Sequence, residues 1–201
     1  ALDHISAAAG HVMDLLTDVI DLSRIEAGAL PLALEPVRVD DVVDEVFGLL
    51  SAKAEQRRVR LSSGLDDQVV QADRRRLRQV LLNLVGNSIR HGNTGGRVDV
   101  RALPSDDDTW VVLSVDDDGP GIPPDFLPRA FTAFARPSTS TPDQASASTD
   151  TGDASPEDGI GLGLGLAHGL MDAMGGDLAL SRSTSTGTSM TLRLPRPERS
   201  P

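Results

Sequence analysis

The sequence contains no cysteine and no tyrosine, and its aromatic side chains are limited to one Trp and four Phe among 201 residues. The lack of cysteine excludes disulfides and thiol chemistry and leaves the redox compartment open. With so few aromatic residues, the core must consist mainly of Leu, Val, Ile and Ala. No apolar run approaches the ~20 residues that span a membrane, and no signal peptide is visible. We therefore expect a soluble chain with one substantial domain and an appendage.

Positive charge is also scarce. The chain has 30 acidic residues against 19 Lys and Arg, which gives a net charge of −11 at pH 7. Binding to a nucleic-acid backbone needs a basic face, so we expect no nucleic-acid partner. The densest basic group comprises Arg74, Arg75, Arg76 and Arg78. It falls inside a helical pattern and is predicted to be a solvated helix face.

The chain begins with a long helical pattern. Apolar residues recur in steps of three and four from Ile5 to Leu22, which is typical of the seam of a coiled coil or helical bundle. A single helix cannot bury such a seam, so a partner helix or a second protomer is expected. Gly28 ends the helix, and residues 29–38 form an extended linker. His4 and His11 are interpreted as ordinary surface or seam residues of this helix.

From Val39 to Pro195 the pattern changes to that of a compact α/β domain. Asp40 is a candidate N-cap for a helix that extends to about Leu50. Short strands are predicted at 59–62 and 69–71, and hairpins at 97–103 with 110–116 and at 178–182 with 189–194. Residues 137–158 are almost wholly Ser, Thr, Pro, Asp and Ala, which predicts a mobile loop. Residues 196–201 are predicted to be a tail.

One helix of this domain carries two asparagines with a shared direction. Its apolar residues recur at helical spacing between 77 and 89, with Asp73 as a plausible N-cap. Gly92 follows the last turn, where a left-handed residue would end the helix. Asn83 and Asn87 are four residues apart and therefore point the same way. Taken alone, two solvent-facing amides are the simpler interpretation.

The first of two glycine-rich segments follows the strand that ends near Asp116. Asp117, Gly119 and Gly121 place a carboxylate beside closely spaced glycines. Glycines there let a ligand approach the backbone, and the carboxylate can accept a hydrogen bond from a ligand amine. A tight acidic turn is the alternative explanation.

The second segment runs from Gly159 to Ala167, directly before a helical pattern. A glycine run at the start of a helix offers free backbone N–H groups and the positive end of the helix dipole, which suit phosphate groups. The segment lacks the Lys-Ser/Thr of a P-loop. It also does not follow a strand with an acid ~20 residues later, so it fits the Rossmann fingerprint poorly.

Together and in this order, these segments resemble the histidine kinases and the ATP-binding fold that they share with gyrase, Hsp90 and MutL. The resemblance covers essentially the whole chain. Residues 79–91 resemble the N box, 117–121 the first glycine box, 131–136 the F box, 161–167 the second glycine box and 187–188 the Gly-Thr near the end of the sheet. Residues 21–28, Asp-Leu-Ser-Arg-Ile-Glu-Ala-Gly, resemble the end of the second helix of the dimerisation domain.

The resemblance implies a fold and a domain organisation. The fold would be an α/β (α+β) two-layer sandwich, with a mixed, mostly antiparallel sheet that carries helices on one face. Residues 1–28 would be the second helix of the dimerisation and phosphotransfer bundle, 29–38 a linker, 39–195 the catalytic ATP-binding domain, 137–158 its mobile lid and 196–201 a tail.

The resemblance also implies roles for individual residues around Mg²⁺ and ATP. Asn87 would coordinate Mg²⁺ through its amide oxygen, which suits a hard cation, and Asn83 would support the metal or a phosphate. Arg90 and His91 would face the phosphates, with Arg90 able to bind them bidentately. Asp117 would accept the adenine amino group, with Thr188 nearby through water. The remaining expected ATP contacts are Gly119, Gly121, Ile122, Gly161, Leu162, Gly163, Leu164, Gly165 and Leu166, and Phe131 and Phe134 would anchor the lid.

The phosphoacceptor is where the sequence departs from the family. The acceptor His of histidine kinases is followed by an acid and, a few residues later, by a Pro, and neither His4 nor His11 has this context. We therefore expect a catalytic fragment that transfers the γ-phosphoryl group of ATP to a His outside this chain, for relay to an aspartate of a response-regulator receiver domain. The full-length protein would be a homodimer through the helical bundle. The expected location is cytoplasmic, with the possibility of a membrane-bound sensor.

Two alternatives remain open. A non-catalytic module that binds ATP or partner proteins, such as a pseudokinase or an anti-sigma-type kinase, would keep the same boxes. A gyrase-type ATPase is disfavoured, because such enzymes place a Glu general base where this helix has Asn83.

Overall fold

The computed structural model describes residues 2–105, 107–133, 135 and 161–198. Side chains are described from Met13 onward, except that of Asp14. The predicted lid at 137–158, the lid anchor Phe134 and the last residues of the predicted tail therefore lie outside the described residues. The same holds for the side chains of His4 and His11.

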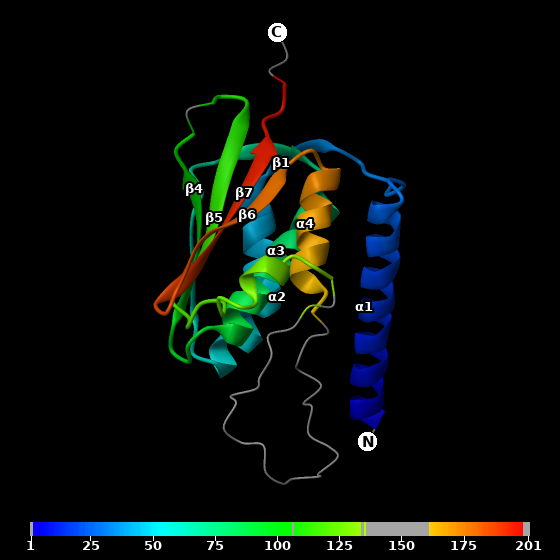
Figure 1. Cartoon of the computed structure of the whole chain (residues 1–201), viewed down its shortest axis with the longest axis vertical. Coiled ribbons are helices and arrows are strands. Elements are labelled where there is room, and N and C mark those ends of the chain that lie inside the picture. Colours follow the sequence, from blue (N-terminus) through cyan, green and yellow to red (C-terminus); the bar gives the residue numbers. More distant parts are fainter. Residues whose placement is uncertain (1, 106, 134, 136–160, 199–201) are drawn as a thin grey trace.

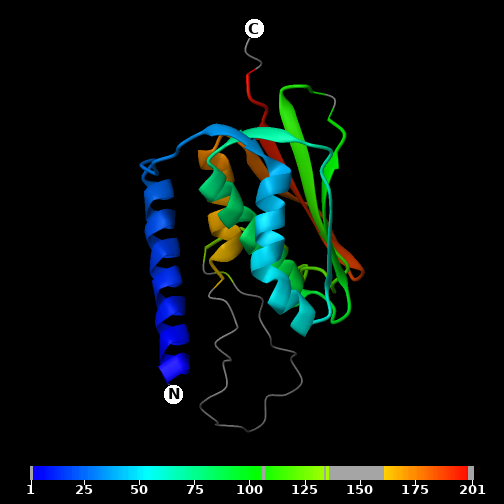
Figure 2. The same ribbon diagram turned by 180° about the vertical axis from the view of Figure 1, so that it is seen from behind.

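Helix α1 (Leu2–Glu26) is the long helix that the sequence predicts. It ends where Gly28 adopts a left-handed conformation with φ +63°, as expected for a glycine after a helix. Figures 1 and 2 both show α1 beside α4, on the side away from the main sheet. Its apolar residues Met13, Leu16, Val19 and Ile20 are exposed, whereas Ile25 packs against the core.

The main sheet has five strands in the order β2-β4-β5-β7-β6. Strands β4 (Arg97–Leu103) and β5 (Trp110–Asp117) form one antiparallel pair, and β6 (Asp177–Thr184) and β7 (Gly187–Pro195) form another. Strand β5 pairs with β7, which joins the two hairpins. Strand β2 (Arg60–Gly64) is parallel to β4, so the sheet is mixed but mostly antiparallel, as predicted.

A second, two-stranded sheet lies at the entry to the domain. Strand β1 (Glu35–Arg38) pairs antiparallel with β3 (Val69–Ala72). The stretch that the sequence describes only as an extended linker therefore ends in a paired strand. Val37 and Val70 are register partners and both are buried, so this small sheet contributes to the same core.

Helices α2 (Val39–Gln56), α3 (Arg74–His91) and α4 (Gly163–Ala173) cover one face of the main sheet (Figure 1). Helix α3 lies between the other two and contacts both. A short 3₁₀ helix, η1 (Leu127–Arg129), follows β5 and was not predicted. The core is almost entirely aliphatic, as the composition requires, and includes Leu77, Leu81, Ile89, Leu113, Leu166, Leu170 and Leu192.

Three local predictions are wrong. Asp40 does not cap α2: the N-cap residue is Arg38, and Asp40 lies in the first turn, where a negative charge still suits the helix dipole. Gly92 ends α3 with φ −70° rather than a positive φ. Glycine is needed there because a Cβ would collide with the carbonyl oxygen of Ser88. Arg76 is not solvated but only 3% exposed.

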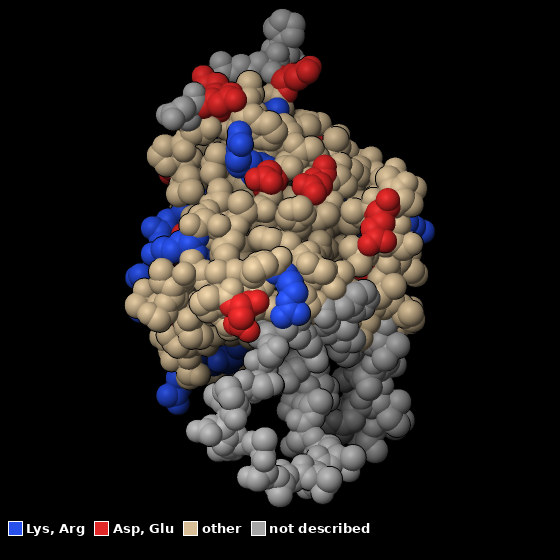
Figure 3. All heavy atoms as spheres, viewed as in Figure 1, with Lys and Arg blue, Asp and Glu red and all other residues tan. Residues whose placement is uncertain are grey.

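The described surface is not uniformly charged. On the face in Figure 3, acidic and basic side chains are scattered among larger uncharged areas. Among the described residues, no helix combines the length and the apolar composition needed to cross a membrane.

Candidate nucleotide-binding site

Helix α3 presents both asparagines to the start of α4. Asp73 caps α3 by accepting a hydrogen bond from the backbone N–H of Arg76 at 3.1 Å, as predicted. Ten residues beyond this cap, the side-chain amide of Asn83 donates to the carbonyl oxygen of Gly163 at 3.2 Å. A Cβ on Gly163 would lie 3.6 Å from Nδ2 of Asn87. The N box and the second glycine box, 80 residues apart in sequence, therefore meet in space.

The backbone N–H groups in the first turn of α4 have no capping side chain among the described residues. The N-cap residue, Leu162, makes no side-chain capping bond, and the turn contains no acidic residue. The first N–H groups of a helix have no partner within the helix. Gly161 precedes the cap with φ +78°, a conformation that glycine adopts without strain. This helix start can accept an anion such as a phosphate group beside Asn83 and Asn87.

Not every predicted residue of the second glycine box can contact a ligand through its side chain. Leu162 and Leu166 are buried and Leu164 packs against the core, so these leucines offer only backbone groups. Gly165 serves packing: a Cβ there would lie 3.0 Å from the carbonyl oxygen of Phe131. The start of the box therefore leaves backbone N–H groups open to a phosphate, whereas its later residues pack closely against neighbouring elements.

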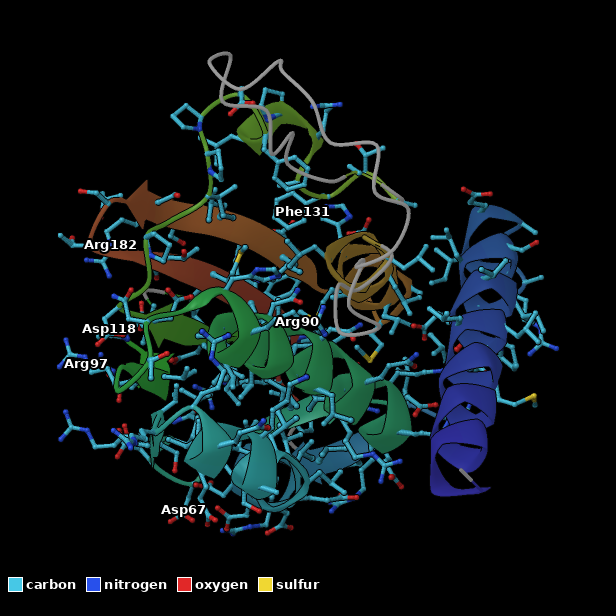
Figure 4. All side chains as sticks on the ribbon, turned by 90° about the horizontal axis from the view of Figure 1, so that it is seen from below. Asp67, Arg90, Arg97, Asp118, Phe131 and Arg182 are labelled. Carbon is cyan, nitrogen blue, oxygen red and sulfur yellow. The ribbon has the colours of Figure 1, made fainter. Side chains whose placement is uncertain are left out.

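Arg90 and His91 are the last two residues of α3, in the turn that follows Asn87. The Nε atom of Arg90 is buried and makes no hydrogen bond, which is unusual for a guanidinium group. Arg57 fixes the backbone here, because its guanidinium donates to the carbonyl oxygens of Arg90 and Gly92. In the view of Figure 4, Arg90 and Phe131 are labelled beside α4, on the side away from α1. His91 is exposed.

Asp117 is the one acid of the 116–118 run that faces α3. Its Oδ2 accepts a hydrogen bond from the hydroxyl of Ser88 at 3.0 Å, and its Oδ1 accepts from the backbone N–H groups of Gly119 at 2.9 Å and Thr188 at 3.3 Å. A carboxylate offers about four acceptor positions. These three bonds fix the carboxylate and leave capacity for one further donor, such as a ligand amine.

The neighbouring acids have other partners. Asp116 lies within ion-pair distance of Arg101 and Arg182 and accepts a hydrogen bond from Ser114. Asp118 accepts a bond from the backbone N–H of Arg97 at 3.0 Å. The chain has three consecutive acids at 116–118, of which the resemblance singles out Asp117, and the alternation of side chains along β5 turns Asp117 to the opposite face from Asp116.

Ser88 is a residue of the site that the sequence analysis missed. It is buried and hydrogen-bonds Asp117. The bond joins residues 29 positions apart, so no local pattern in the sequence indicated it. Thr188, which was predicted, lies opposite Asp117 in the β5–β7 ladder.

The first glycine box runs close to neighbouring backbone. Gly119 lies against Gly92, where a Cβ would be 3.0 Å from the Gly92 Cα. Gly121 has φ +78°, and a Cβ there would collide with the carbonyl oxygen of Thr184. The backbone N–H of Ile122 donates to the Ser183 hydroxyl at 2.8 Å. These contacts hold the loop that follows Asp117 against β6.

The F box is only partly described. Phe131 packs against the core, with its ring centroid 5.2 Å from that of His168. Phe134, the other predicted lid anchor, lies outside the described residues.

These residues fit a nucleotide with its metal ion. The buried, unbonded Nε of Arg90, the uncapped start of α4 and the remaining acceptor capacity of Asp117 supply cationic, N–H and carboxylate groups around one region. The amide oxygen of Asn87 adds the kind of neutral oxygen ligand that Mg²⁺ accepts.

A cavity of about 800 Å³ lies at the other end of α3 and has a different character. It is lined by Arg24, by the connector around Leu32 and by the first turn of α3 from Asp73 to Arg76. Asn83 and Asn87 do not line it, so this cavity is separate from the candidate site formed by α3, α4 and the end of β5.

The fold and this arrangement define an ATP-binding domain of the two-layer α+β class. Residues 72–198 match the family described as histidine kinase-, DNA gyrase B-, and HSP90-like ATPase. The chain belongs to this family.

Its relatives include sensor histidine kinases. The chain is 32% identical over 200 residues to the sensory/regulatory protein RpfC of Xanthomonas campestris pv. campestris. The aligned region covers 96% of this chain and 26% of the relative. It is 33% identical over 185 residues to the signal transduction histidine-protein kinase AfsQ2 of Streptomyces coelicolor, which covers 91% of this chain and 30% of that one. The chain thus spans about a quarter to a third of the length of these relatives.

Solved structures share the fold. Full-length ShkA in complex with AMPPNP matches with a TM-score of 0.75 and 29% identity, over 96% of this chain and 38% of that one. The Acinetobacter baumannii histidine kinase AdeS matches with a TM-score of 0.76 over 96% of this chain and 83% of that one. Its 22% identity supports the fold alone. The predicted family and fold class are confirmed.

Proposed function

We propose that this chain is the catalytic part of a two-component sensor histidine kinase, which binds Mg-ATP and transfers the γ-phosphoryl group to a histidine outside these 201 residues. The main observation behind the proposal is that Asn83 and Asn87 lie against the start of α4. The next residue, Ser88, hydrogen-bonds Asp117. The sensor kinases among the relatives support it.

Bound Mg-ATP would supply the phosphoryl group and much of the charge neutralisation. Asn87 would hold the metal through its amide oxygen, and Asn83, fixed by Gly163, would orient the phosphates beside the N–H groups of α4. Arg90 would offset the phosphate charge. Asp117 would accept the adenine amino group and so orient the base. Phosphoryl transfer depends mainly on such positioning and electrostatic stabilisation.

The amide at position 83, where gyrase-type enzymes have a Glu general base, favours transfer over hydrolysis. Asn83 is an amide whose nitrogen already donates to Gly163, and an amide cannot take a proton from water at neutral pH. A gyrase-type ATPase would need a carboxylate at this position.

The domain organisation is part of the proposal. Residues 1–28 would form the second helix of the dimerisation bundle, 29–38 the linker, 39–195 the catalytic domain with a lid at 137–158, and 196–201 a tail. The exposed apolar residues Met13, Leu16, Val19 and Ile20 of α1 suit packing against the acceptor helix and a second protomer. The response-regulator partner and a cytoplasmic location follow from the same assignment. ThkA, a histidine kinase with a similar fold, has been solved in complex with a response regulator protein.

The experiment is phosphoryl transfer to a supplied acceptor. The chain is mixed with labelled ATP, Mg²⁺ and a separate protein that carries the acceptor helix of a dimerisation domain, and acid-labile label on that protein is measured. Asn87→Ala should abolish transfer. Gln68→Ala, which removes a surface amide bonded locally to Asp66, is the matched control and should leave transfer unchanged.

Undiminished transfer by Asn87→Ala would remove Asn87 from the metal site. Acid-labile label on His4 or His11 in the chain alone would show that the acceptor lies within this chain, against the proposal.

A further inference from the structure

Two charged side chains are buried between α1 and α3. Asp21 and Arg76 are each 3% exposed, and theirs is the one ion pair within the described part of the chain with both side chains buried. The pair is bidentate: Nη2 of Arg76 donates to Oδ1 of Asp21 at 2.9 Å, and Nη1 donates to Oδ2. Parallel double bonds of this kind fix orientation as well as distance.

A second polar link lies one turn away. The Nη1 atom of Arg76 also donates to Oε1 of Gln79 at 3.0 Å, and Nε2 of Gln79 donates to Oδ1 of Asp18 at 3.1 Å. Asp18 and Asp21 are three residues apart on α1, as Arg76 and Gln79 are on α3. Two polar pairs, Asp21 with Arg76 and Asp18 with Gln79, therefore form at equal spacing along α1 and α3. Both pairs can form together in only one alignment of the two helices.

An apolar contact joins α1 to α4 as well. A Cβ on Gly169 of α4 would lie 3.0 Å from Cγ2 of Ile25, so α1 approaches α4 closely at a glycine. In Figure 4 the side chains of α1 extend toward both α3 and α4. Helix α1 thus contacts the two helices that meet at the nucleotide site.

A buried ion pair contributes more to a defined geometry than to stability. Desolvation of two charges offsets much of their attraction, but removing one partner leaves the other charged and buried, which is strongly unfavourable. Rotating α1 by one residue, about 100°, would carry Asp21 away from Arg76 and leave both charges without compensation. The pair therefore holds α1 in one position against α3.

The same face of α3 continues to the nucleotide site. Arg76, Gln79, Asn83 and Asn87 follow at steps of three and four, so they lie along one side of the helix. Asn83 bonds Gly163 at the start of α4. One end of α3 is thus fixed by α1 and the other by the segment proposed to hold the phosphates.

We infer that Asp21 and Arg76, assisted by Asp18 and Gln79, are positioning residues that couple the place of α1 to nucleotide affinity. This inference rests on the proposed function, because it concerns the same nucleotide site. With α1 held, α3 and α4 are fixed for Asn83 and Asn87 to meet the phosphates. When α1 is released, the contact between α3 and α4 loosens and affinity falls. By linkage, bound nucleotide also favours the held position of α1 by the same factor.

The test uses the whole chain with Asp21→Asn, a change of nearly equal volume. Affinity for the non-hydrolysable analogue AMPPNP with Mg²⁺ is measured by calorimetry, and amide hydrogen exchange is measured along residues 15–26. We expect at least about fivefold weaker binding, the lower end of typical coupling between sites, together with faster exchange in α1. Asp18→Ala, which removes the acceptor of the Gln79 bond without leaving a buried charge, should change both measurements in the same direction by less.

Glu45→Gln is the matched control. Glu45 of α2 pairs with Arg74 and Arg78 on exposed parts of α3. The substitution removes a negative charge beside α3 without changing any contact of α1. AMPPNP affinity and hydrogen exchange in α1 should therefore stay at their wild-type values. An equal loss of affinity in Glu45→Gln and Asp21→Asn would overturn the inference.

A double-mutant cycle separates coupling from general damage. If Asp21 and Arg76 act through each other, Asp21→Asn combined with Arg76→Gln should bind AMPPNP no more weakly than the weaker single variant. A double variant whose loss is the product of the two single losses would contradict the inference.

The failure of this inference is distinguishable from failure of the proposed function. If the wild-type chain binds no AMPPNP, the proposed function fails. If the wild type binds and Asp21→Asn binds equally well, only the positioning role is overturned.

Discussion

The assignment of Asp117 to the base of the nucleotide gives the sharpest prediction. Asp117→Asn keeps the size of the side chain and an oxygen for the backbone N–H groups of Gly119 and Thr188. The other carboxylate oxygen, which accepts from Ser88, becomes an NH₂ group. An amine of the ligand would then face a donor instead of an acceptor.

The magnitude follows from one hydrogen bond. A hydrogen bond to a charged group contributes roughly 1.5–3 kcal/mol, and 1.4 kcal/mol corresponds to about tenfold in affinity. Asp117→Asn should therefore weaken ATP binding by roughly 10- to 150-fold. Discrimination against GTP should fall as well, because guanine presents an oxygen where adenine has its amino group, and an amide can donate to that oxygen.

The assay is calorimetric titration of ATP and GTP into wild type, Asp117→Asn and Asp116→Asn. Asp116 is the control, because its partners are Ser114, Arg101 and Arg182. Its variant should keep wild-type affinity. Wild-type affinity in Asp117→Asn, or an equal loss in both variants, would refute the argument that the strand register selects Asp117 alone.

Two further predictions concern stability. Gly121→Ala should lower the free energy of unfolding in urea by about 1–2 kcal/mol for its left-handed conformation and by a further ~1–3 kcal/mol for the collision with Thr184. Gly95 has the same φ of +78° with open space around it, so Gly95→Ala should lose only the free energy that belongs to the left-handed conformation. An equal loss of unfolding free energy in the two variants would contradict the collision. Arg78, which hydrogen-bonds Glu45, holds the pKa of that carboxyl below its ordinary value of 4.5. A lowered pKa in the folded state stabilises the protein above about pH 4.5, and the effect is lost as the pH falls through the folded value. Glu45→Gln should therefore lower the urea midpoint slightly at pH 7 and not at pH 3, and a difference that persists at pH 3 would exclude the ion pair as its cause.

Much of the fold follows from local pattern. Alternating apolar residues give the two hairpins, and the 3.6-residue period gives α3 with Asp73 as its cap. The parallel pairing of β2 with β4 could not be predicted, because it depends on how the chain crosses between the two strands and not on the pattern within either strand. The strand at Glu35–Arg38 was hidden by Pro36, which usually argues against a strand but is tolerated at a sheet edge.

The site was predictable in its residue types and less so in its neighbours. Asn83, Asn87 and Asp117 were selected because the segments around them resemble known motifs, and their roles are part of the proposal. Ser88 and the burial of Arg76 were missed, since each depends on a partner far along the chain: Asp117 for Ser88 and Asp21 for Arg76. A cluster of four arginines within five residues is usually solvated, and only the approach of α1 makes one of them an interior residue.

The close approach of Gly165 to the backbone of Phe131 has a consequence for substitutions at this glycine. The atoms nearest to a Cβ there are backbone atoms of Phe131 and Ala133, at 3.0 to 3.3 Å. Backbone cannot move aside as readily as the end of a flexible side chain, so even alanine at position 165 would push residues 131–133 away from α4. This one position therefore limits which sequences can keep the F box beside the second glycine box.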